Sequence, residues 1–356
     1  MKKTVLRTLS LSVLMGLGAF AFAASATPGT LYNETIYNNK SNIACNGKCF
    51  NQYPSSLFID ANNNVWVSYA GVITELPAPN YVPVVVGKAH TTLNKSLFAQ
   101  SPNNSMWTLQ SDLDHVGWVN LHQYIGQSGG QAVQIVYNVT AYPWNGLVGL
   151  TADDQGNIWI ATPVQYSGGG YTGKLVVYQP STSVVTTLNT LPITSVLADP
   201  NHNVVWATSI GSSSSNLMTI SMVPPYAQSS PVPLPNFNNM VVGMALLGDD
   251  QLWISGTSLS GTSLIRNNTT GITYPVSQLT TPIYMAYSSG LGLIFVSAAQ
   301  GVLQGYYSNP ISWVPPLDNT RKPISFTAPQ GIAVDGYGNI WVADVNQVVE
   351  LTPISS

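Results

Sequence analysis

The chain has 356 residues, of which 45% are hydrophobic and only 7% are charged, and its formal net charge is −3. So large a hydrophobic fraction excludes an intrinsically disordered chain. The few basic residues form no cluster in the body of the sequence, which argues against nucleic acid as a partner. Helix signals are too few for an α/β fold.

The first 26 residues have the organisation of a secretory signal peptide. Lys2, Lys3 and Arg7 precede the apolar run Leu9–Phe22, and Ala24-Ser25-Ala26 offers a cleavage site. No cysteine stands at the cleavage site, so a lipoprotein anchor is not expected. No later segment has 18 unbroken apolar residues, so we expect no transmembrane segment. We therefore predict Sec-type export to the periplasm or the extracellular space.

Residues 27–56 carry two features ahead of the main body of the chain. Thr30–Tyr37 is an isolated strand-like run. Cys45 and Cys49 are the two cysteines of the sequence, and the intervening Asn-Gly-Lys favours a tight turn. In an oxidising compartment we expect a local disulfide between them. A metal site is the alternative, but two thiols with no nearby His fall short of a four-ligand set.

Residues 57–356 contain a repeat of about 46 residues, the length of a β-propeller blade. A large aromatic residue sits inside a β-like run in each repeat, and we call these positions the aromatic series. Its members are Trp66, Trp107, Trp159, Trp206, Trp253, Phe295 and Trp341. The sequence therefore predicts an all-β, seven-bladed β-propeller of four-stranded blades.

Each repeat reads as strands a, b and c, usually followed by a fourth strand, d. The clearest a, b and c sets are Leu57–Asp60, Val65–Tyr69 and Val72–Leu76; Val148–Asp153, Ile158–Thr162 and Leu175–Tyr178; Val196–Asp199, Val204–Thr208 and Leu217–Ile220; and Gly331–Asp335, Asn339–Asp344 and Gln347–Leu351. The d candidates are Tyr81–Val86, Val133–Asn138, Val184–Leu188, Ile272–Pro275 and Ile311–Val314. The proline-rich residues 224–235 allow only an edge strand.

The b strands are apolar on both faces, as expected for strands buried between neighbouring blades. We therefore interpret the aromatic series as inter-blade packing rather than as a ligand site. Asp60, Asp153 and Asp335 each lie six residues before a member of the series, where they are expected to hold the a–b turn. A calcium loop is the alternative for Asp153–Asn157, which lacks the spaced acidic ligands of an EF-hand.

The last repeat ends after its strand c, which would leave an exposed sheet edge. We therefore predict that Thr30–Tyr37 becomes the outer strand of blade seven and closes the ring.

The segment Pro329–Asp344 resembles an NHL repeat and the repeats of the streptogramin (virginiamycin B) lyase-like propellers, and Gly149–Ala161 is a second good match. Weaker copies extend the resemblance over nearly all of the mature chain. The lyase resemblance implies a His/Glu cluster with a magnesium ion near the central channel. This chain departs from that pattern, because none of its histidines stands in a Glu-x-His pair; they are His90, His115, His122 and His202.

Lactonase-type propellers bind a divalent metal through carboxylate and Asn side chains on inner strands, and that resemblance is also incomplete. Directly after the b-strand motifs, only Asp344 is acidic. A metal centre needs several convergent oxygen ligands. We therefore expect no cofactor and leave a divalent cation in the channel as an alternative.

The connections between strands b and c are uneven in length, and such loops usually carry the function of a rigid scaffold. Asp112, Asp114 and His115 are a candidate metal or acid–base group in blade two, although a solvated loop is the favoured interpretation because no partner from another blade is evident. Tyr166 and Tyr171 flank three glycines in blade three and could stack on a sugar or a protein partner.

These patterns favour an exported, non-catalytic propeller that acts as a protein-binding or scaffolding module, monomeric unless it joins an envelope assembly. The fold signal is complete, whereas no nucleophile elbow or phosphate-binding motif is present. One alternative is a lyase- or lactonase-like metal-dependent enzyme whose residues are spread over several blades. The other is a glycan-binding propeller.

Overall fold

The computed structural model describes residues 30–38, 54–69, 72–87, 97–111, 119–125, 128–133, 149–161, 165–167, 170–172, 174–188, 191–211, 214–237, 241–247, 251–279, 284–298, 300–306 and 311–354. These residues form strands, turns and loops. In this part of the chain no helix is long and apolar enough to cross a membrane.

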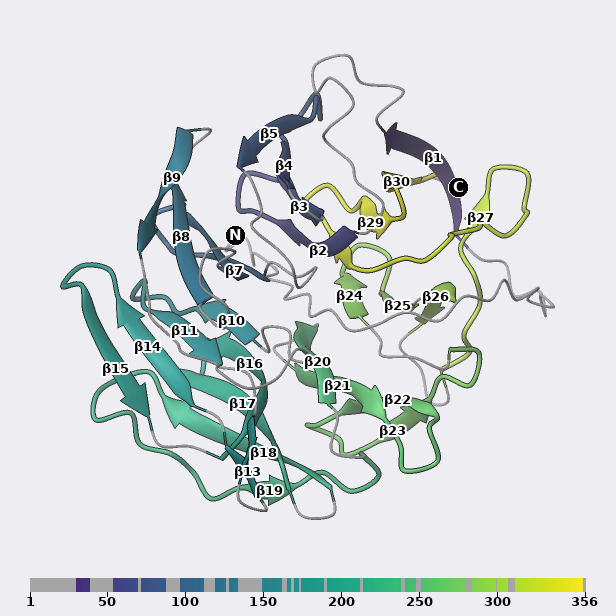
Figure 1. Cartoon of the computed structure of the whole chain (residues 1–356). Coiled ribbons are helices and arrows are strands. Elements are labelled where there is room, and N and C mark those ends of the chain that lie inside the picture. Colours follow the sequence, from purple (N-terminus) through teal and green to yellow (C-terminus); the bar gives the residue numbers. More distant parts are fainter. Residues whose placement is uncertain are drawn as a thin grey trace.

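Seven sheets, antiparallel apart from one parallel strand pair, are arranged as the blades of a closed ring (Figure 1). The innermost strand of each blade contacts the innermost strands of the blades on either side, from β2 through β6, β10, β16, β20, β24 and β28 and back to β2. The seven-bladed β-propeller predicted from the repeat is therefore confirmed.

The first four blades each have four strands. From the centre outward they are β2 (Pro54–Ile59), β3 (Val65–Tyr69), β4 (Val72–Leu76) and β5 (Val84–Gly87); β6 (Leu97–Gln100), β7 (Met106–Ser111), β8 (Val119–Ile125) and β9 (Ser128–Val133); β10 (Gly149–Ala152), β11 (Ile158–Ala161), β14 (Leu175–Gln179) and β15 (Val184–Leu188); and β16 (Ile193–Asp199), β17 (Val204–Ile210), β18 (Ser215–Ser221) and β19 (Val232–Pro233).

The last three blades differ in their outer strands. In the same order they are β20 (Val241–Leu247), β21 (Gln251–Thr257), β22 (Ser263–Asn267) and β23 (Thr273–Pro275); β24 (Tyr284–Ser288), β25 (Leu293–Ala298) and β26 (Gly301–Tyr306); and β28 (Ile332–Val334), β29 (Ile340–Asp344), β30 (Gln347–Pro353), β1 (Leu31–Asn38) and β27 (Leu317–Asp318).

The N-terminal strand closes the ring, as the sequence predicts. β1 pairs antiparallel with β30 over seven residues, from Tyr32 opposite Pro353 to Asn38 opposite Gln347. β27 then pairs parallel with the other edge of β1. Blade seven is therefore built from both ends of the sequence, and its outer edge is covered.

Two expected outer strands are placed differently. In blade two, strand d is β9, which begins only two residues after β8 and ends at Val133, whereas the rest of the expected Val133–Asn138 lies outside the described residues. In blade six, Ile311–Val314 forms no strand and contributes only an isolated bridge between Val314 and Gln304. Prolines stand on both sides of this segment, and proline supplies no donor to a ladder.

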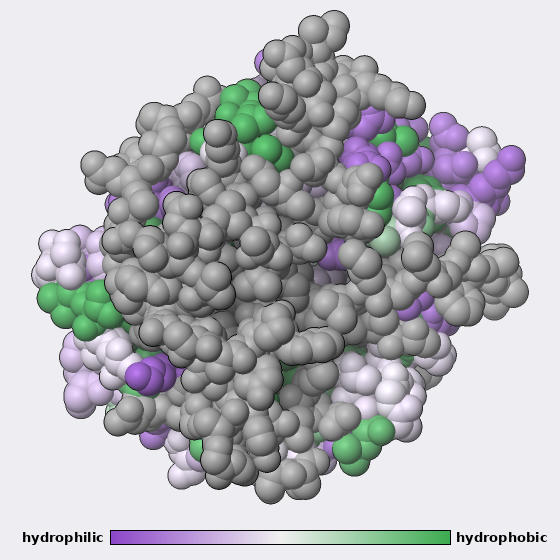
Figure 2. Space-filling view, in the orientation of Figure 1, coloured by the Kyte–Doolittle hydropathy of each residue, from purple (hydrophilic) through white to green (hydrophobic). Residues whose placement is uncertain are grey.

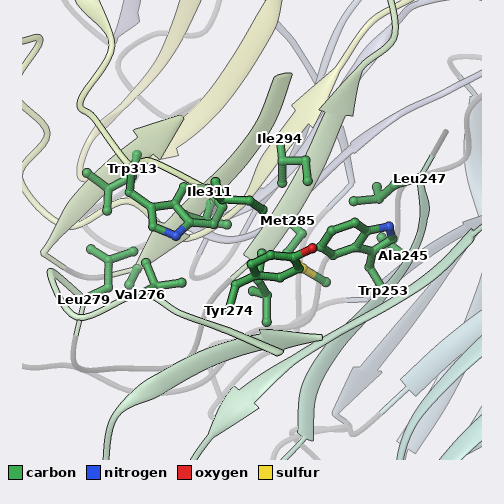
Figure 3. Close-up of a cluster of buried hydrophobic side chains, with 14 residues drawn as sticks. Ala245, Leu247, Trp253, Tyr274, Val276, Leu279, Met285, Ile294, Ile311 and Trp313 are labelled. Atoms are coloured by element: carbon green, nitrogen blue, oxygen red, sulfur yellow. The ribbon is translucent and has the colours of Figure 1, made fainter. Parts of the chain in front are cut away.

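Among the described residues, the buried hydrophobic side chains form seven clusters, one at each interface between blades. In each cluster the aromatic series residue of one blade packs against apolar side chains of the next. Figure 3 shows the interface between blades five and six, where Trp253 and Tyr274 lie beside Met285 and Ile294. Inter-blade packing of the series is thus confirmed, with six members buried and Trp206 half-buried.

Candidate functional site

The alternating strand directions give the ring two different faces. The b–c connections leave one face, here called the loop face, and the a–b and c–d turns leave the opposite one, the turn face. The sequence places the candidate binding residues on the loop face.

On the loop face, the connection between β11 and β14 in blade three folds into a hairpin. Its strands are β12 (Gln165–Ser167) and β13 (Gly170–Thr172), which form a two-stranded sheet of their own. The register sets Tyr166 directly opposite Tyr171. The structure therefore brings these two candidates together on a folded hairpin rather than on an irregular loop.

Asp344 ends β29 on the loop face and is fully buried. Its carboxylate accepts hydrogen bonds from the backbone N–H groups of Thr327 (3.0 Å) and Ala328 (2.7 Å), and from Nε2 of Gln347 (3.2 Å). Asp344 thus anchors the segment that enters blade seven. The neighbouring Tyr69 hydroxyl donates a hydrogen bond to the backbone carbonyl of Gln347. Burial, and then the charge of Asp344, raise the pKa of Tyr69.

The remaining candidate residues cannot be placed. Asp112, Asp114 and His115 lie outside the described residues, and so do Cys45 and Cys49. Within the described ranges, no three His, Cys, Asp or Glu side chains come together in a way that could hold a metal ion.

The inner strands, which surround the central axis, are built from apolar, hydroxyl and amide residues. The sequences of β2, β6, β10, β16, β20, β24 and β28 contain one ionisable acidic residue, Asp199 at the end of β16, and neither His nor a basic residue. Asp199 points to the turn face, where its carboxylate accepts the Trp206 indole N–H at 2.9 Å.

The a–b turns of the turn face carry a repeated hydrogen-bond network. In blade three, the Asp153 carboxylate accepts from the Trp159 indole N–H at 2.9 Å. The same contact joins Asp60 to Trp66 at 3.0 Å and Asp335 to Trp341 at 2.9 Å. Blade two uses a serine hydroxyl, because Ser101 accepts the Trp107 indole N–H at 3.0 Å.

The same carboxylates also hold their own turns, as the sequence predicts. The Asp153 carboxylate accepts from the backbone N–H groups of Gln155 and Asn157 and from the Asn157 side-chain amide. With the indole of Trp159 this makes four donors on two oxygens. The Asp153 carboxylate is therefore fully used by these donors and is not available for the calcium interpretation of Asp153–Asn157.

Tyrosines complete the aromatic packing on this face. Tyr178 packs edge-on against Trp107 with ring centroids 5.9 Å apart, and Tyr226 does the same to Trp159 at 5.4 Å. Each tyrosine belongs to the blade that follows its tryptophan. On strand c, Gln123 lies opposite Trp107 and Val177 lies opposite Trp159. In both blades the next residue is a tyrosine, Tyr124 or Tyr178, and this recurrence is visible in the sequence.

The junction between blades seven and one concentrates polar groups around Trp341. Tyr37 stacks on this indole at 5.5 Å, and its hydroxyl donates a 2.8 Å hydrogen bond to the Glu350 carboxylate. Tyr81 packs on the same indole at 4.7 Å. Burial, and then the charge of Asp335, raise the pKa of Glu350, whereas the Tyr37 hydrogen bond lowers it.

Glu75 occupies the matching position on β4, opposite Trp66. Its side chain is 5% exposed, and its buried Oε2 finds no hydrogen-bond partner among the described residues. Burial, with a contribution from Asp60, raises its pKa to about 7. Part of the Glu75 population is therefore protonated at neutral pH.

Sequence reasoning singled out one carboxylate–imidazole group, in blade two, which lies outside the described residues, and it missed another in blade four. The Nδ1 atom of His202 lies 2.8 Å from the Asp199 carboxylate on the turn face. The His202 side chain is 60% exposed, and Asp199 also holds Trp206, so the imidazole is an accessory to the turn rather than part of an enclosed site.

No family model and no curated protein matches this sequence. Among solved structures, the chain is similar to streptogramin B lyase, with 13% identity and a TM-score of 0.64 over 91% of this chain and 98% of the other. It is also similar to Kuenenia stuttgartiensis hydrazine synthase, with 11% identity and a TM-score of 0.62 over 85% and 96%. The WD40 propeller domain of Doa1 has 10% identity and a TM-score of 0.59 over 92% and 98%.

Likeness at such low identity shows the fold alone. The class of protein is therefore a seven-bladed β-propeller, an architecture that hosts unrelated functions.

Proposed function

We propose that this protein is an exported, non-catalytic β-propeller that binds a protein partner on its loop face and serves as a scaffold in the bacterial envelope or the extracellular space. The observation that carries the proposal is the use of its buried carboxylates. These carboxylates accept hydrogen bonds from within the protein, so their role is structural rather than ligand binding. They belong to Asp60, Asp153, Asp335 and Asp344.

The composition of the inner strands supports the same proposal. Catalysis in the channel of a propeller needs acids, bases or metal ligands that converge on the axis. The described inner strands offer chiefly apolar and hydroxyl side chains. Recognition through the loops that rise from a rigid ring fits this composition better.

The blade-three hairpin is the feature of the loop face best suited to recognition. It adds two short strands and two tyrosines to a connection that a simple turn could have made. Tyrosine provides apolar area with a polar tip, and interfaces are enriched in it. A glycan is the second candidate ligand, favoured by the register that sets Tyr166 opposite Tyr171.

The proposal can be tested by cross-linking the purified protein to surface and secreted proteins of the bacterium that makes it. The captured partner is then titrated against the purified protein. The double variant Tyr166→Ser/Tyr171→Ser should weaken binding at least tenfold, because such aromatic residues often dominate an interface. Tyr337→Ser is the matched control, since Tyr337 is 66% exposed on the turn face. Equal loss in both variants, or binding to glycans alone, would contradict protein recognition at the hairpin.

The enzymatic alternative needs its own assay. We expect purified protein with added Mg²⁺ or Ca²⁺ to leave cyclic depsipeptides and lactones unchanged. Metal-dependent turnover of either substrate class would overturn the non-catalytic proposal, whatever the binding assay gave.

A further inference from the structure

The outer edges of the blades differ in how they are protected against pairing with another strand. An unpaired edge is a template for a further strand, and natural sheets block it with short strands, prolines, bulges, charges or a covering segment. Here β19 is two residues long and ends in Pro233, and β23 is three residues long and ends in Pro275. β1 is covered by β27.

The other blades with irregular edges are also protected. The pairing of β5 contains a register shift at Ile73/Thr74, and the pairing of β9 contains one at Gln123/Ile125. Blade six ends in the isolated bridge at Val314. Bulges and short bridges twist or interrupt an edge, so a further strand cannot align with it.

Among the described residues, the edge of blade three has none of these forms of protection. β15 pairs with β14 in unbroken register over five residues, and its sequence, Val-Val-Thr-Thr-Leu, contains neither proline nor charge. Between residues 155 and 198 the one charged residue is Lys174. Val184 and Val185 are 46% and 47% exposed, although they point to opposite faces of the blade.

The surface agrees with this description. Figure 2 shows hydrophobic atoms at the left edge of the molecule, flanked by weakly polar ones, on the side where Figure 1 places β15. β-branched residues on a regular, uncharged edge are the composition that favours strand addition.

We propose that β15 pairs antiparallel with β15 of a second copy of this chain, so that two four-stranded blades form one continuous sheet across a two-fold axis. The sequence of β15 is compatible with pairing to a second copy of the same strand. An antiparallel pair centred on Thr186 sets Val184 opposite Leu188 and Val185 opposite Thr187, all of them residues that stabilise cross-strand pairs. The strand brings no charge to the axis, so no like charges on it meet there. This inference does not depend on the proposed function.

The expected dimer is weak. One strand pair of five residues buries less surface than the roughly 1,200 Å² typical of a stable interface. We therefore expect a dissociation constant on the order of 10 µM, so that monomer and dimer exchange within an accessible concentration range.

Sedimentation velocity of the mature chain from about 1 µM to about 200 µM tests the proposal. The wild type should shift from monomer to dimer, and Val185→Lys should raise the dissociation constant at least tenfold, because two lysines then lie diagonally across the axis. Val232→Lys is the matched control, since Val232 is 61% exposed on β19 of the adjacent blade. It should dimerise like the wild type.

A charge-pair experiment separates lost pairing from lost folding. An equimolar mixture of Val185→Lys and Val185→Glu should form the heterodimer at least as well as the wild type forms its dimer, because opposite charges now meet. A wild type that stays monomeric throughout the concentration range would overturn the proposal. So would a dimer that both Val185→Lys and the mixture leave unchanged.

Discussion

The indole N–H of Trp159 donates a 2.9 Å hydrogen bond to the carboxylate of Asp153, six residues earlier in the chain. The same contact in other blades makes the a–b turn and the inter-blade core one structural unit. Oδ1 of Asp153 accepts hydrogen bonds from backbone N–H groups of the turn. Oδ2 accepts from the Trp159 indole and from the Asn157 side-chain amide. Blade six has a phenylalanine at this position, which has no N–H and needs no acceptor.

Replacement of Asp153 by Ala should lower the free energy of unfolding by about 3 kcal/mol, because it leaves the buried donors of Asn157 and Trp159 without an acceptor. Asp154→Ala, at the exposed neighbouring position, should change stability by less than about 0.5 kcal/mol. Urea denaturation of both variants measures the difference. A cycle with Trp159→Phe should give a coupling of about 1–2 kcal/mol, and additive effects would argue against the network.

A chain that begins at Ser41 lacks β1 and should melt at least about 10 °C lower than the mature protein. It loses the pairing of β1 with β30 and exposes the edge of the last blade. Calorimetry gives the comparison. Equal melting temperatures would mean that β1 does not close the ring in solution.

Tyr37→Phe tests the same junction without removing the strand. It should cost about 1–2 kcal/mol, because the hydroxyl that donates to Glu350 is lost while the stacking on Trp341 remains. Thr35→Ser on the same strand is the control. A loss below about 0.3 kcal/mol would show that the hydrogen bond contributes little.

Glu75 should make stability fall as pH rises between about 4.5 and about 7. Its pKa is raised to about 7 in the folded protein, so the folded state holds a proton that the unfolded state releases in this window. Glu75→Gln should therefore match the wild type at pH 4.5 and exceed it by about 1–3 kcal/mol at pH 8.5. Denaturant titrations at both pH values supply the data, and an unchanged difference would refute the raised pKa.

Asp344→Ala should lower the free energy of unfolding by about 2–4 kcal/mol, because the N–H groups of Thr327 and Ala328 lose their charged acceptor. Added Ca²⁺ or Mg²⁺ should leave the melting temperature of both proteins unchanged. A metal-induced rise in the wild type that the variant lacks would instead make Asp344 a metal ligand.

The fold could be predicted from the sequence because its signals are local and repeated. The strand bounds Val65–Tyr69 and Val184–Leu188 agree residue for residue with β3 and β15. Ring closure followed from the missing outer strand of the last repeat. The outer strands were harder to place, because they are half exposed and their sequence pattern is weak. Their positions also depend on where prolines allow pairing, as the isolated bridge near Ile311–Val314 shows.

The site could be predicted less well, because its contacts join residues that the sequence does not mark as partners. The spacing from Asp153 to Trp159 was visible, but the hydrogen bond depends on the indole turning back over the turn. Asp344 was singled out for its acidity, whereas its burial and its contact with Thr327 depend on the path of a distant connection. The pairing of Tyr166 with Tyr171 required the hairpin itself.

The antiparallel pairing of β1 with β30 has a consequence for the order of assembly. The ribosome makes β1 first and its partner last, with roughly 310 residues between them. A growing chain can form blades one after another, yet its first strand lacks its antiparallel partner until the final repeat is complete. A protein shortened before β30 would lack the antiparallel pairing that joins β1 to the last blade, so that the closed form requires β30.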